Sequence, residues 1–239
     1  MLIRNFAFFW IGEDISIPSM LVNSIRLIYG EEAHVYYLTD NKTPIIHGVN
    51  KIIRGMLPKG LMLARLKAYS NLKSQDYVAF IDADSLIINK LYLPEIVSGK
   101  ILIVRRKKEG YIIDHNYPER YPEFKDKTLE EMMPFLFGIL ITKKSNSLFI
   151  ALLKILTKEF PERYHRWYGD QMALVYYWAN NQELFLEIPI GSCLHIIRSN
   201  LSSNEIEDLK NKNIPILTFK GPDSKGFIKE TLEYLKGVD

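Results

Sequence analysis

The segment that most constrains the fold of this chain is residues 77–88, with the sequence YVAFIDADSLII. Five apolar residues are followed by Asp82, Ala83 and Asp84, and a second apolar run comes directly after them. An apolar run of this length predicts a strand that is covered on both faces. In an extended chain, residues two apart point to the same side, so the two carboxylates are expected to face one spot.

Two carboxylates this close repel each other unless a cation lies between them. A hard divalent ion, Mn²⁺ or Mg²⁺, suits this place, because it takes one or two protein carboxylates and fills its other positions with water and phosphate oxygens. The sequence therefore predicts a metal site made by Asp82 and Asp84. The other interpretation of these residues is a solvated turn at the end of the strand.

Strands and helices alternate along the rest of the chain. Short apolar runs predict strands at residues 6–10, 35–38, 77–81, 101–104, 135–142, 184–188 and 214–219, with extended chain at 86–88. Helices are expected from about residue 18 to Gly30, with Ser16 as the cap, and at 61–72, 147–160, 170–180 and 225–236. This alternation is typical of the α/β class, with a mainly parallel central sheet flanked by helices. No linker or repeat divides the sequence, so a single domain over residues 1–239 is expected.

The composition argues against several classes of protein. Hydrophobic residues make up 47% of the chain, which is enough for a core and argues against disorder. The net charge is only +3, so we expect no nucleic-acid partner. No apolar stretch approaches the roughly 20 residues that span a bilayer, and the N-terminus is expected to be a buried strand rather than a signal peptide. Cys193 is the single cysteine, so no internal disulfide can form, and a cytoplasmic location is expected.

Polar residues follow the first two predicted strands. Gly12 and Asp14 come after the first, and Asp40 comes after the second. Ligands of such sheets bind outside the carboxyl ends of the strands, so these residues are expected to lie beside Asp82 and Asp84. Asp14 either accepts a hydrogen bond from a bound nucleoside or forms a turn. A basic run from Arg105 to Lys108 is either a solvated loop or a patch facing a phosphate or an anionic membrane, which would allow peripheral membrane contact.

Several segments resemble known glycosyltransferases. YVAFIDADSLII looks like the D-x-D strand of glycosyltransferases with the GT-A fold. ARLKAY, residues 64–69, resembles the preceding helix in glycosyltransferase family 8, the family of glycogenin and bacterial lipopolysaccharide galactosyltransferases. PFLFGILITKK resembles that family's strand beside the sugar pocket, YGDQMAL its acidic-Gln motif, and FKGPDSK its loop over the diphosphate. The resemblance covers most of the chain in the same order.

This resemblance implies a GT-A fold and metal-dependent transfer of a sugar from a nucleotide-diphosphate donor, with a UDP-sugar expected. The acceptor would be a saccharide, a glycolipid or a protein, and residues 111–121 are expected to shape its site. The resemblance also implies retention of the anomeric configuration and places Asp170 and Gln171 at the catalytic centre. The residues expected to bind the nucleotide sugar are Gly12, Asp14, Asp40, Arg65, Asp82, Ala83, Lys220, Gly221 and Lys225.

The sequence departs from the family pattern at three positions. Thr218 stands where the family has a metal-binding His, Leu136 stands at its sugar-pocket Asn, and Lys225 comes one residue later than its loop Lys. His195 could supply the missing metal ligand, although a lone His in an apolar run is more often a core residue.

Other interpretations of these residues stay open. Arg65 could be a surface residue, Asp170 an acid at the start of a helix, and the C-terminal lysines a solvated loop. A phosphatase of the haloacid-dehalogenase type also places a D-x-D after a buried strand. A non-catalytic protein that binds nucleotide sugars would fit the missing His and Asn.

Overall fold

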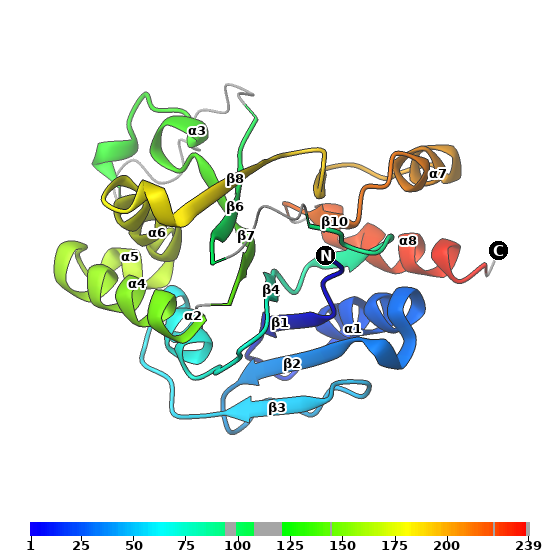
Figure 1. Cartoon of the computed structure of the whole chain (residues 1–239), viewed down its shortest axis with the longest axis horizontal. Coiled ribbons are helices and arrows are strands. Elements are labelled where there is room, and N and C mark those ends of the chain that lie inside the picture. Colours follow the sequence, from blue (N-terminus) through cyan, green and yellow to red (C-terminus); the bar gives the residue numbers. More distant parts are fainter. Residues whose placement is uncertain (94–98, 108–120, 144, 222, 238–239) are drawn as a thin grey trace.

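The computed structural model describes residues 1–93, 99–107, 121–143, 145–221 and 223–237. The predicted acceptor segment at residues 111–121 lies, except for Tyr121, outside these described residues. Seven strands between residues 5 and 189 form one sheet (Figure 1). Its strands are β1 (Asn5–Phe9), β2 (His34–Thr39), β3 (Lys51–Arg54), β4 (Val78–Ile81), β6 (Ile101–Arg105), β7 (Phe135–Thr142) and β8 (Phe185–Pro189).

The sheet has the order β3-β2-β1-β4-β7-β6-β8. The first four strands in this order run parallel to one another, and β6 is parallel to β8. Only β7 runs against its neighbours in the sheet as described, pairing antiparallel with β4 and β6. The mainly parallel α/β architecture predicted from the sequence is therefore confirmed.

A second, three-stranded sheet has the order β5-β10-β9. It consists of β5 (Ser85–Ile87), β9 (Leu194–Ile197) and β10 (Ile216–Phe219), with β10 antiparallel to β5 and parallel to β9. The chain passes from β4 of the main sheet to β5 of the second sheet through Asp82, Ala83 and Asp84. The D-x-D segment is thus the covalent link between the two sheets.

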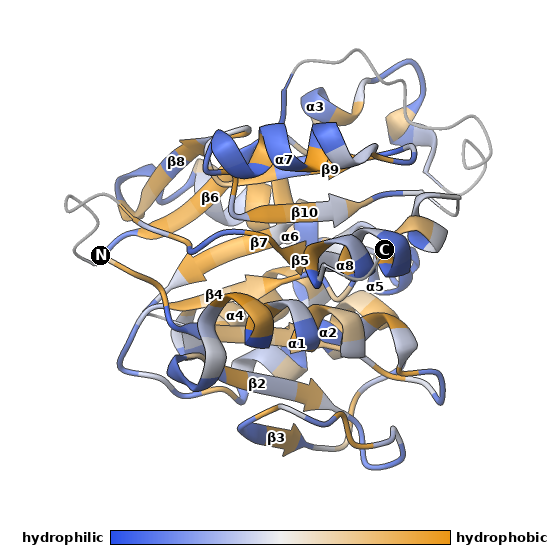
Figure 2. Cartoon of the chain, turned by 90° about the vertical axis from the view of Figure 1, so that its right-hand side faces the viewer, coloured by the Kyte–Doolittle hydropathy of each residue, from blue (hydrophilic) through white to orange (hydrophobic). Residues whose placement is uncertain are grey.

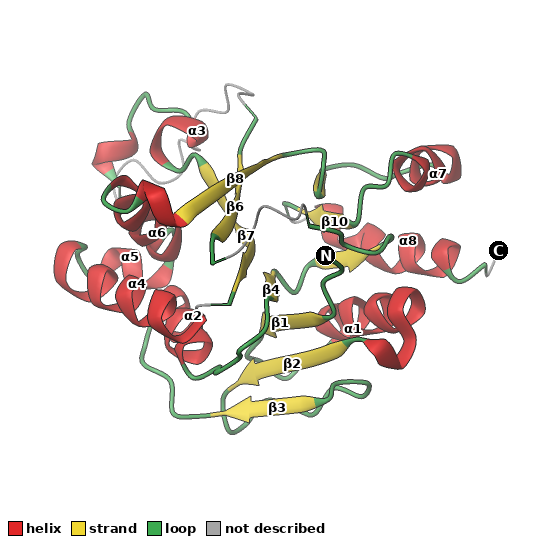
Figure 3. Cartoon of the chain, viewed as in Figure 1, coloured by secondary structure: helices red, strands yellow, loops and turns green. Residues whose placement is uncertain are grey.

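Helices cover both faces of the main sheet, as the drawing by secondary structure in Figure 3 shows. Alternate strand residues point to opposite faces, so Ala7 and Phe9 lie in one core and Phe6 and Phe8 in the other. The first core is completed by α2 (Leu61–Ser70), α4 (Ser145–Glu159) and α6 (Gly169–Ala179), and the second by α1 (Ser16–Tyr29). A third core lies between the second sheet, α7 (Ser203–Asn211) and α8 (Phe227–Leu235). Figure 2 shows the apolar strands between more polar helix surfaces.

The remaining elements are short. They are the α-helices α3 (Leu129–Met132) and α5 (Arg163–Arg166) and the 3₁₀ helices Gly30–Glu32, Pro122–Phe124, Gln182–Leu184 and Asp223–Gly226. No helix in the described part of the chain is both long and apolar enough to cross a membrane.

One capping prediction is wrong. Ser16 is the first residue of α1 rather than its cap, and the capping position is Ile15. The Oδ1 of Asp14 instead accepts a hydrogen bond from the backbone N–H of Ser16, at 2.8 Å. The acid two residues before the helix thus satisfies one of its free N–H groups.

Candidate active site

The Asp82–Asp84 segment is held from both sides by backbone hydrogen bonds. The N–H of Asp82 donates to the carbonyl of Gly138 in β7 at 3.0 Å, and the N–H of Phe219 in β10 donates to the carbonyl of Asp84 at 2.9 Å. The two carboxylates therefore lie between the two sheets, at the carboxyl end of β4. This is the place where ligands of open α/β sheets bind.

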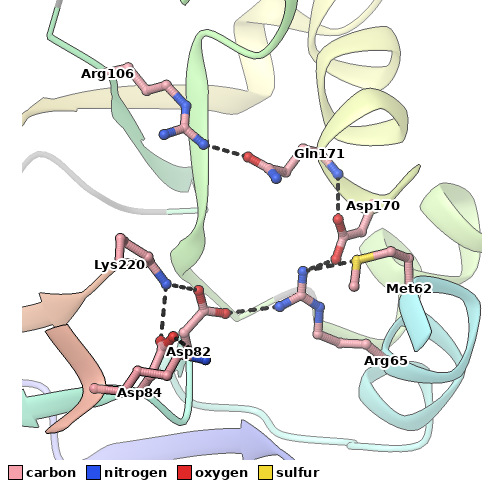
Figure 4. A network of polar contacts seen from close by, with 9 residues as sticks. Met62, Arg65, Asp82, Asp84, Arg106, Asp170, Gln171 and Lys220 are labelled. Atoms are coloured by element: carbon pink, nitrogen blue, oxygen red, sulfur yellow. Dashed lines mark hydrogen bonds and ion pairs between the residues drawn. The ribbon is translucent and has the colours of Figure 1, made fainter. Parts of the chain in front are cut away.

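Arg65 on α2 joins two of the predicted acids (Figure 4). Its Nη1 donates to Oδ1 of Asp82 at 2.8 Å, and its Nη2 donates to Oδ2 of Asp170. The guanidinium also lies over the ring of Phe137, 4.7 Å from the ring centre. Because a guanidinium is a flat fork, it can bridge two carboxylates that a single ammonium could not hold in this geometry.

Asp170 is the second residue of α6 and is fully buried. Its Oδ1 accepts from the backbone N–H of Gln171 at 2.8 Å. The side-chain oxygen of Gln171 in turn accepts from Nη2 of Arg106 at 2.6 Å. A continuous line of polar contacts thus runs from Asp82 through Arg65 to Arg106 (Figure 4).

Lys220 closes the other side of the D-x-D segment. Its Nζ lies 2.6 Å from Oδ2 of Asp82 and 3.0 Å from Oδ1 of Asp84. The Nζ of Lys225 lies 3.5 Å from Oδ2 of Asp84. The loop after β10 therefore brings two positive charges onto the two aspartates.

These contacts set the protonation states of the cluster. Burial on its own would raise the pKa of Asp82, but Lys220 and Arg65 outweigh it and lower the pKa to about 2. Burial lowers the pKa of Lys220, but the two aspartates outweigh it and raise the pKa above its ordinary value. Burial raises the pKa of Asp170, against the opposing effect of Arg65. At neutral pH, Asp82 is therefore a carboxylate and Lys220 an ammonium.

A cavity of about 1020 Å³ opens over this cluster. This is at the upper end of the range for small-molecule sites. Its wall combines charged groups with aromatic rings, and includes Trp10, Arg65, Asp82, Ala83, Asp84, Arg106, Leu136, Trp167, Tyr168, Gln171, Arg198, Lys220, Gly221 and Lys225. Among the described residues, the structure thus places eight of the predicted site residues on one cavity wall and buries Asp170 behind Arg65.

Three predicted nucleotide contacts do not line this cavity. Asp40 accepts hydrogen bonds from the N–H and hydroxyl of Thr43, and the same hydroxyl accepts from the N–H of Gly12 at 3.1 Å. Asp40 also lines a neighbouring cavity of about 450 Å³. Asp14 holds the start of α1, and its carbonyl accepts from the indole N–H of Trp10. The hydrogen bonds of Asp14 and Asp40 are those of turn-forming residues.

His195 does not join the two aspartates. It lies in β9, paired with Leu217 of β10, and does not line the cavity. Among the residues that the structure describes, no three His, Cys, Asp or Glu side chains gather where they could hold a metal ion. Thr218 is buried, and its hydroxyl has no hydrogen-bond partner, as is also true of its strand partner Ser85.

The sequence analysis did not single out several residues of the cavity wall, among them Trp10, Trp167, Tyr168 and Arg198. Arg106 was noted only as part of a basic run, but it points inward to Gln171, whereas its neighbour Arg105 pairs with Glu187 at the surface. The Tyr168 position could have been found from its place directly before the Gly-Asp-Gln segment.

Two glycosyltransferases of known structure have the same fold as this chain. The apo form of the glycosyltransferase GlyE from Streptococcus pneumoniae TIGR4 matches 96% of the chain with a TM-score of 0.57 and 14% identity, and a further GlyE structure matches equally widely with 0.55 and 14%. The apo structure of the bifunctional glycosyltransferase WbbM matches 100% of the chain with a TM-score of 0.56 and 12% identity. The chain has a GT-A fold.

The chain spans 60% of the length of apo GlyE, 61% of the further GlyE structure and 52% of WbbM. No protein-family model and no curated protein sequence matches it. At these identities the likeness establishes the fold, and assignment to glycosyltransferase family 8 stays a prediction.

Proposed function

We propose that this chain is a glycosyltransferase that moves a sugar from a nucleotide-diphosphate donor, with a UDP-sugar as the first candidate. One observation carries the proposal: five cationic side chains and two carboxylates surround one large cavity at the carboxyl ends of β1 and β4. In a GT-A fold this is where a diphosphate would be held. The cations are Arg65, Arg106, Arg198, Lys220 and Lys225.

In this reaction the bond between the anomeric carbon and the phosphate oxygen breaks, and an acceptor hydroxyl oxygen bonds to that carbon. The hydroxyl proton passes to solvent water, and the nucleoside diphosphate departs with one more negative charge. Positive groups fixed near the departing phosphate lower the barrier by stabilising this charge. Lys220 and Lys225 are placed for that role, and Gly221 between them has a φ of 99°, which favours glycine and leaves room for a phosphate.

Arg65 and Asp170 have different parts in this proposal. Arg65 lines the cavity and can donate to a phosphate or a sugar hydroxyl. Asp170 is fully buried and acts through Arg65, whose orientation it fixes, so it is a positioning residue. Gln171 lines the cavity and offers its amide group to the sugar or the acceptor.

The divalent ion expected from the sequence is not part of this proposal. Mn²⁺ or Mg²⁺ would need oxygen atoms of Asp82 and Asp84, but each of those oxygens already faces a cation of the protein. Ser85 and Thr218 bury unpartnered hydroxyls nearby, yet these groups are neutral and add no charge to attract an ion. The residues as arranged do not fit the ion, and no step of the proposed reaction depends on it.

The aromatic part of the cavity wall suggests the acceptor. Trp10, Trp167 and Tyr168 offer flat apolar surfaces, and Trp167 is 49% exposed. Such surfaces suit the apolar faces of sugar rings, so a saccharide, free or carried on a lipid or protein, is the proposed acceptor. A cytoplasmic site of action and retention of configuration are carried over from the sequence as parts of this proposal.

Thermal unfolding in the presence of nucleoside diphosphates and nucleotide sugars tests the donor. A ligand at about 100 times its dissociation constant adds ~2.7 kcal/mol of stability, and each kcal/mol raises the midpoint by roughly 2–4 °C in a domain of this size. Lys225→Met should weaken the shift, and Lys229→Met, which changes an exposed lysine on α8, should not. If no nucleotide shifts the midpoint, the proposal is wrong.

Activity assays on the same protein distinguish the proposed transferase from two rival functions. Release of UDP from a bound UDP-sugar, stimulated by a saccharide, separates an enzyme from a non-catalytic binding protein. A phosphatase of the haloacid-dehalogenase type would need a carboxylate free to attack phosphorus, whereas both oxygens of Asp82 are held by cations. Hydrolysis of p-nitrophenyl phosphate without any nucleotide binding would favour the phosphatase.

A further inference from the structure

The two aspartates of the D-x-D segment are fully occupied by cations of the chain itself. Oδ1 of Asp82 accepts from Arg65 at 2.8 Å, and Oδ2 lies 2.6 Å from the Nζ of Lys220. Oδ1 of Asp84 lies 3.0 Å from the same Nζ, and Oδ2 lies 3.5 Å from Lys225. Every carboxylate oxygen of the segment thus has a positive partner.

We propose that the ammonium of Lys220 takes the place of the divalent cation expected at Asp82 and Asp84, so that this chain binds its donor without a metal ion. The proposal rests on the proposed function, because it concerns how the donor diphosphate is held. It assigns to Lys220 two roles, neutralising the aspartates and presenting a positive charge to the diphosphate.

The position of Lys220 is the first argument. Its Nζ lies between the two carboxylates and contacts one oxygen of each, which is the place where an ion shared by the pair would lie (Figure 4). Two cations cannot occupy this space together without strong repulsion. An ion could enter only by displacing the lysine from both aspartates.

The anchoring of Lys220 is the second argument. It directly follows β10, and its backbone N–H donates to the carbonyl of Ile197 at 3.0 Å. The preceding residue, Phe219, is bonded to the carbonyl of Asp84. The backbone therefore holds the Cα of Lys220 next to the aspartates. The side chain of Lys220 is only 30% exposed.

The surroundings are the third argument. Mn²⁺ or Mg²⁺ takes at least one or two protein carboxylates, with water and phosphate oxygens in its other positions, and both carboxylates here already face cations of the chain. In the described residues no third acid or His joins the pair, and Thr218 stands where a metal-binding His would be expected from the family resemblance. The described cavity wall instead has more cations than carboxylates, which suits an anionic diphosphate directly.

Titration of the protein with Mn²⁺ in the absence of nucleotide, followed by the paramagnetic resonance signal of free Mn²⁺, tests the place of Lys220. The wild-type chain should leave Mn²⁺ free, whereas Lys220→Ala should take up one ion per chain, because it removes the bridging charge. Lys229→Ala removes a lysine paired with Glu233 on α8 and should behave as the wild type. Uptake of one ion by the wild-type chain, lost in Asp84→Asn, would overturn the proposal.

UDP binding in EDTA and in Mn²⁺ tests the consequence for the donor. The dissociation constant of the wild type should be the same in both, and Lys220→Ala should weaken binding in EDTA by roughly 10- to 100-fold, the range for one hydrogen bond to a charged group. Binding that appears only with Mn²⁺ would overturn the inference and leave the glycosyltransferase proposal standing. Absence of nucleotide binding in both EDTA and Mn²⁺ would overturn the proposed function. The Mn²⁺ titration would still decide whether Lys220 occupies the cation position at Asp82 and Asp84.

Discussion

Asp82 has its two carboxylate oxygens divided between Arg65 of α2 and Lys220 after β10. Its backbone N–H is held by Gly138 of β7, whose α-carbon is so close that an added Cβ would lie 2.5 Å from Oδ2 of Asp82. One residue is therefore in contact with three separate parts of the chain. Changes at Asp82 are expected to affect stability and donor binding together.

The stability of the protein should fall in acid because of Asp82. Its pKa is lowered from 3.8 to about 2 in the folded chain, so its contribution is complete above pH 4 and is lost as the pH falls towards 2. The contribution is roughly 2 kcal/mol. Urea unfolding at pH 5 and pH 2.5 should show a smaller loss for Asp82→Asn than for the wild type. The raised pKa of Asp170 gives a pH dependence of stability with the opposite sign, and Asp170 is present in both proteins. Equal losses of stability in the wild type and in Asp82→Asn would contradict the assignment of the acid sensitivity to Asp82.

Replacing Arg65 by lysine should be costly although the charge is kept. A single ammonium cannot bond to Asp82 and Asp170 as the guanidinium does, and a buried carboxylate would lose its partner. We expect Arg65→Lys to lower the free energy of unfolding by about 2 kcal/mol or more. Arg163→Lys, at an exposed pair with Glu123, is the matched control and should change little. If both substitutions changed the free energy of unfolding in urea equally, the two-pronged contact of the Arg65 guanidinium with Asp82 and Asp170 would not matter for stability.

The sequence predicted the charged side of the site better than its nucleoside side. Asp82, Asp84 and Arg65 were predictable because charged residues beside buried apolar runs need partners or ligands. Asp14 and Asp40 carry the same signal, but their partners are local N–H groups, and residue type alone does not separate a turn from a ligand contact. Arg198 gave no signal, because its place on the wall depends on how β9 is paired.

At the scale of the elements, the start of α6 is the most constrained part of the site. Tyr168 has a φ of 63°, in the left-handed region, and is followed by Gly169, Asp170 and Gln171. A Cβ on Gly169 would run into the backbone carbonyl of Tyr164 and the side chain of Leu156. The close packing of α6 against α4 and α5 therefore fixes where Asp170 meets Arg65.

Gly169→Ala should disturb this arrangement. Overpacking of this kind costs roughly 1–3 kcal/mol, and the shifted helix should also weaken nucleotide binding, because Gln171 and Arg65 lose their placement. Gly226→Ala, at a glycine before α8 with nothing within 4 Å of the added Cβ, is the matched control. Thermal unfolding with and without UDP measures both effects. An unchanged Gly169→Ala protein would show that the start of α6 can move freely.

The elements that the sequence analysis missed share a physical cause. β3 and β9 are only partly buried, and α7 is largely polar, so none of them has a continuous apolar run or a strong apolar period in its sequence (Figure 2). By contrast, the predicted strand at residues 135–142 matches β7 residue for residue, because every residue of it except Gly138 is buried. α7 has a capping box formed by Ser202 and Glu205, which was the available signal.

For the whole molecule, the charged cluster joins two sheets with separate cores. Arg65 and Asp170 belong to the helices on the main sheet, whereas Lys220 follows the second sheet. A donor bound between them would contact both parts. Opening of either sheet would then release the donor. Binding of the donor should therefore slow the opening of both sheets.

Hydrogen exchange with UDP bound tests this coupling. Amides of β9, β10 and α8 should exchange more slowly on binding, by roughly a hundredfold at 100 times the dissociation constant if they exchange through openings that release the nucleotide. Mass spectrometry of peptic peptides gives the rate for each segment. Protection limited to β1, β4 and α2 would mean that the second sheet opens independently of the donor site.

The bridging position of Lys220 has a consequence for how the protein would behave in a cell. A charge that is part of the polypeptide is made together with it, in a fixed ratio of one to one, and cannot be lost by dilution. Growth on a medium poor in manganese would slow a transferase that takes its cation from the surrounding pool. On the proposed arrangement of Lys220, it should leave donor binding by this chain unaffected.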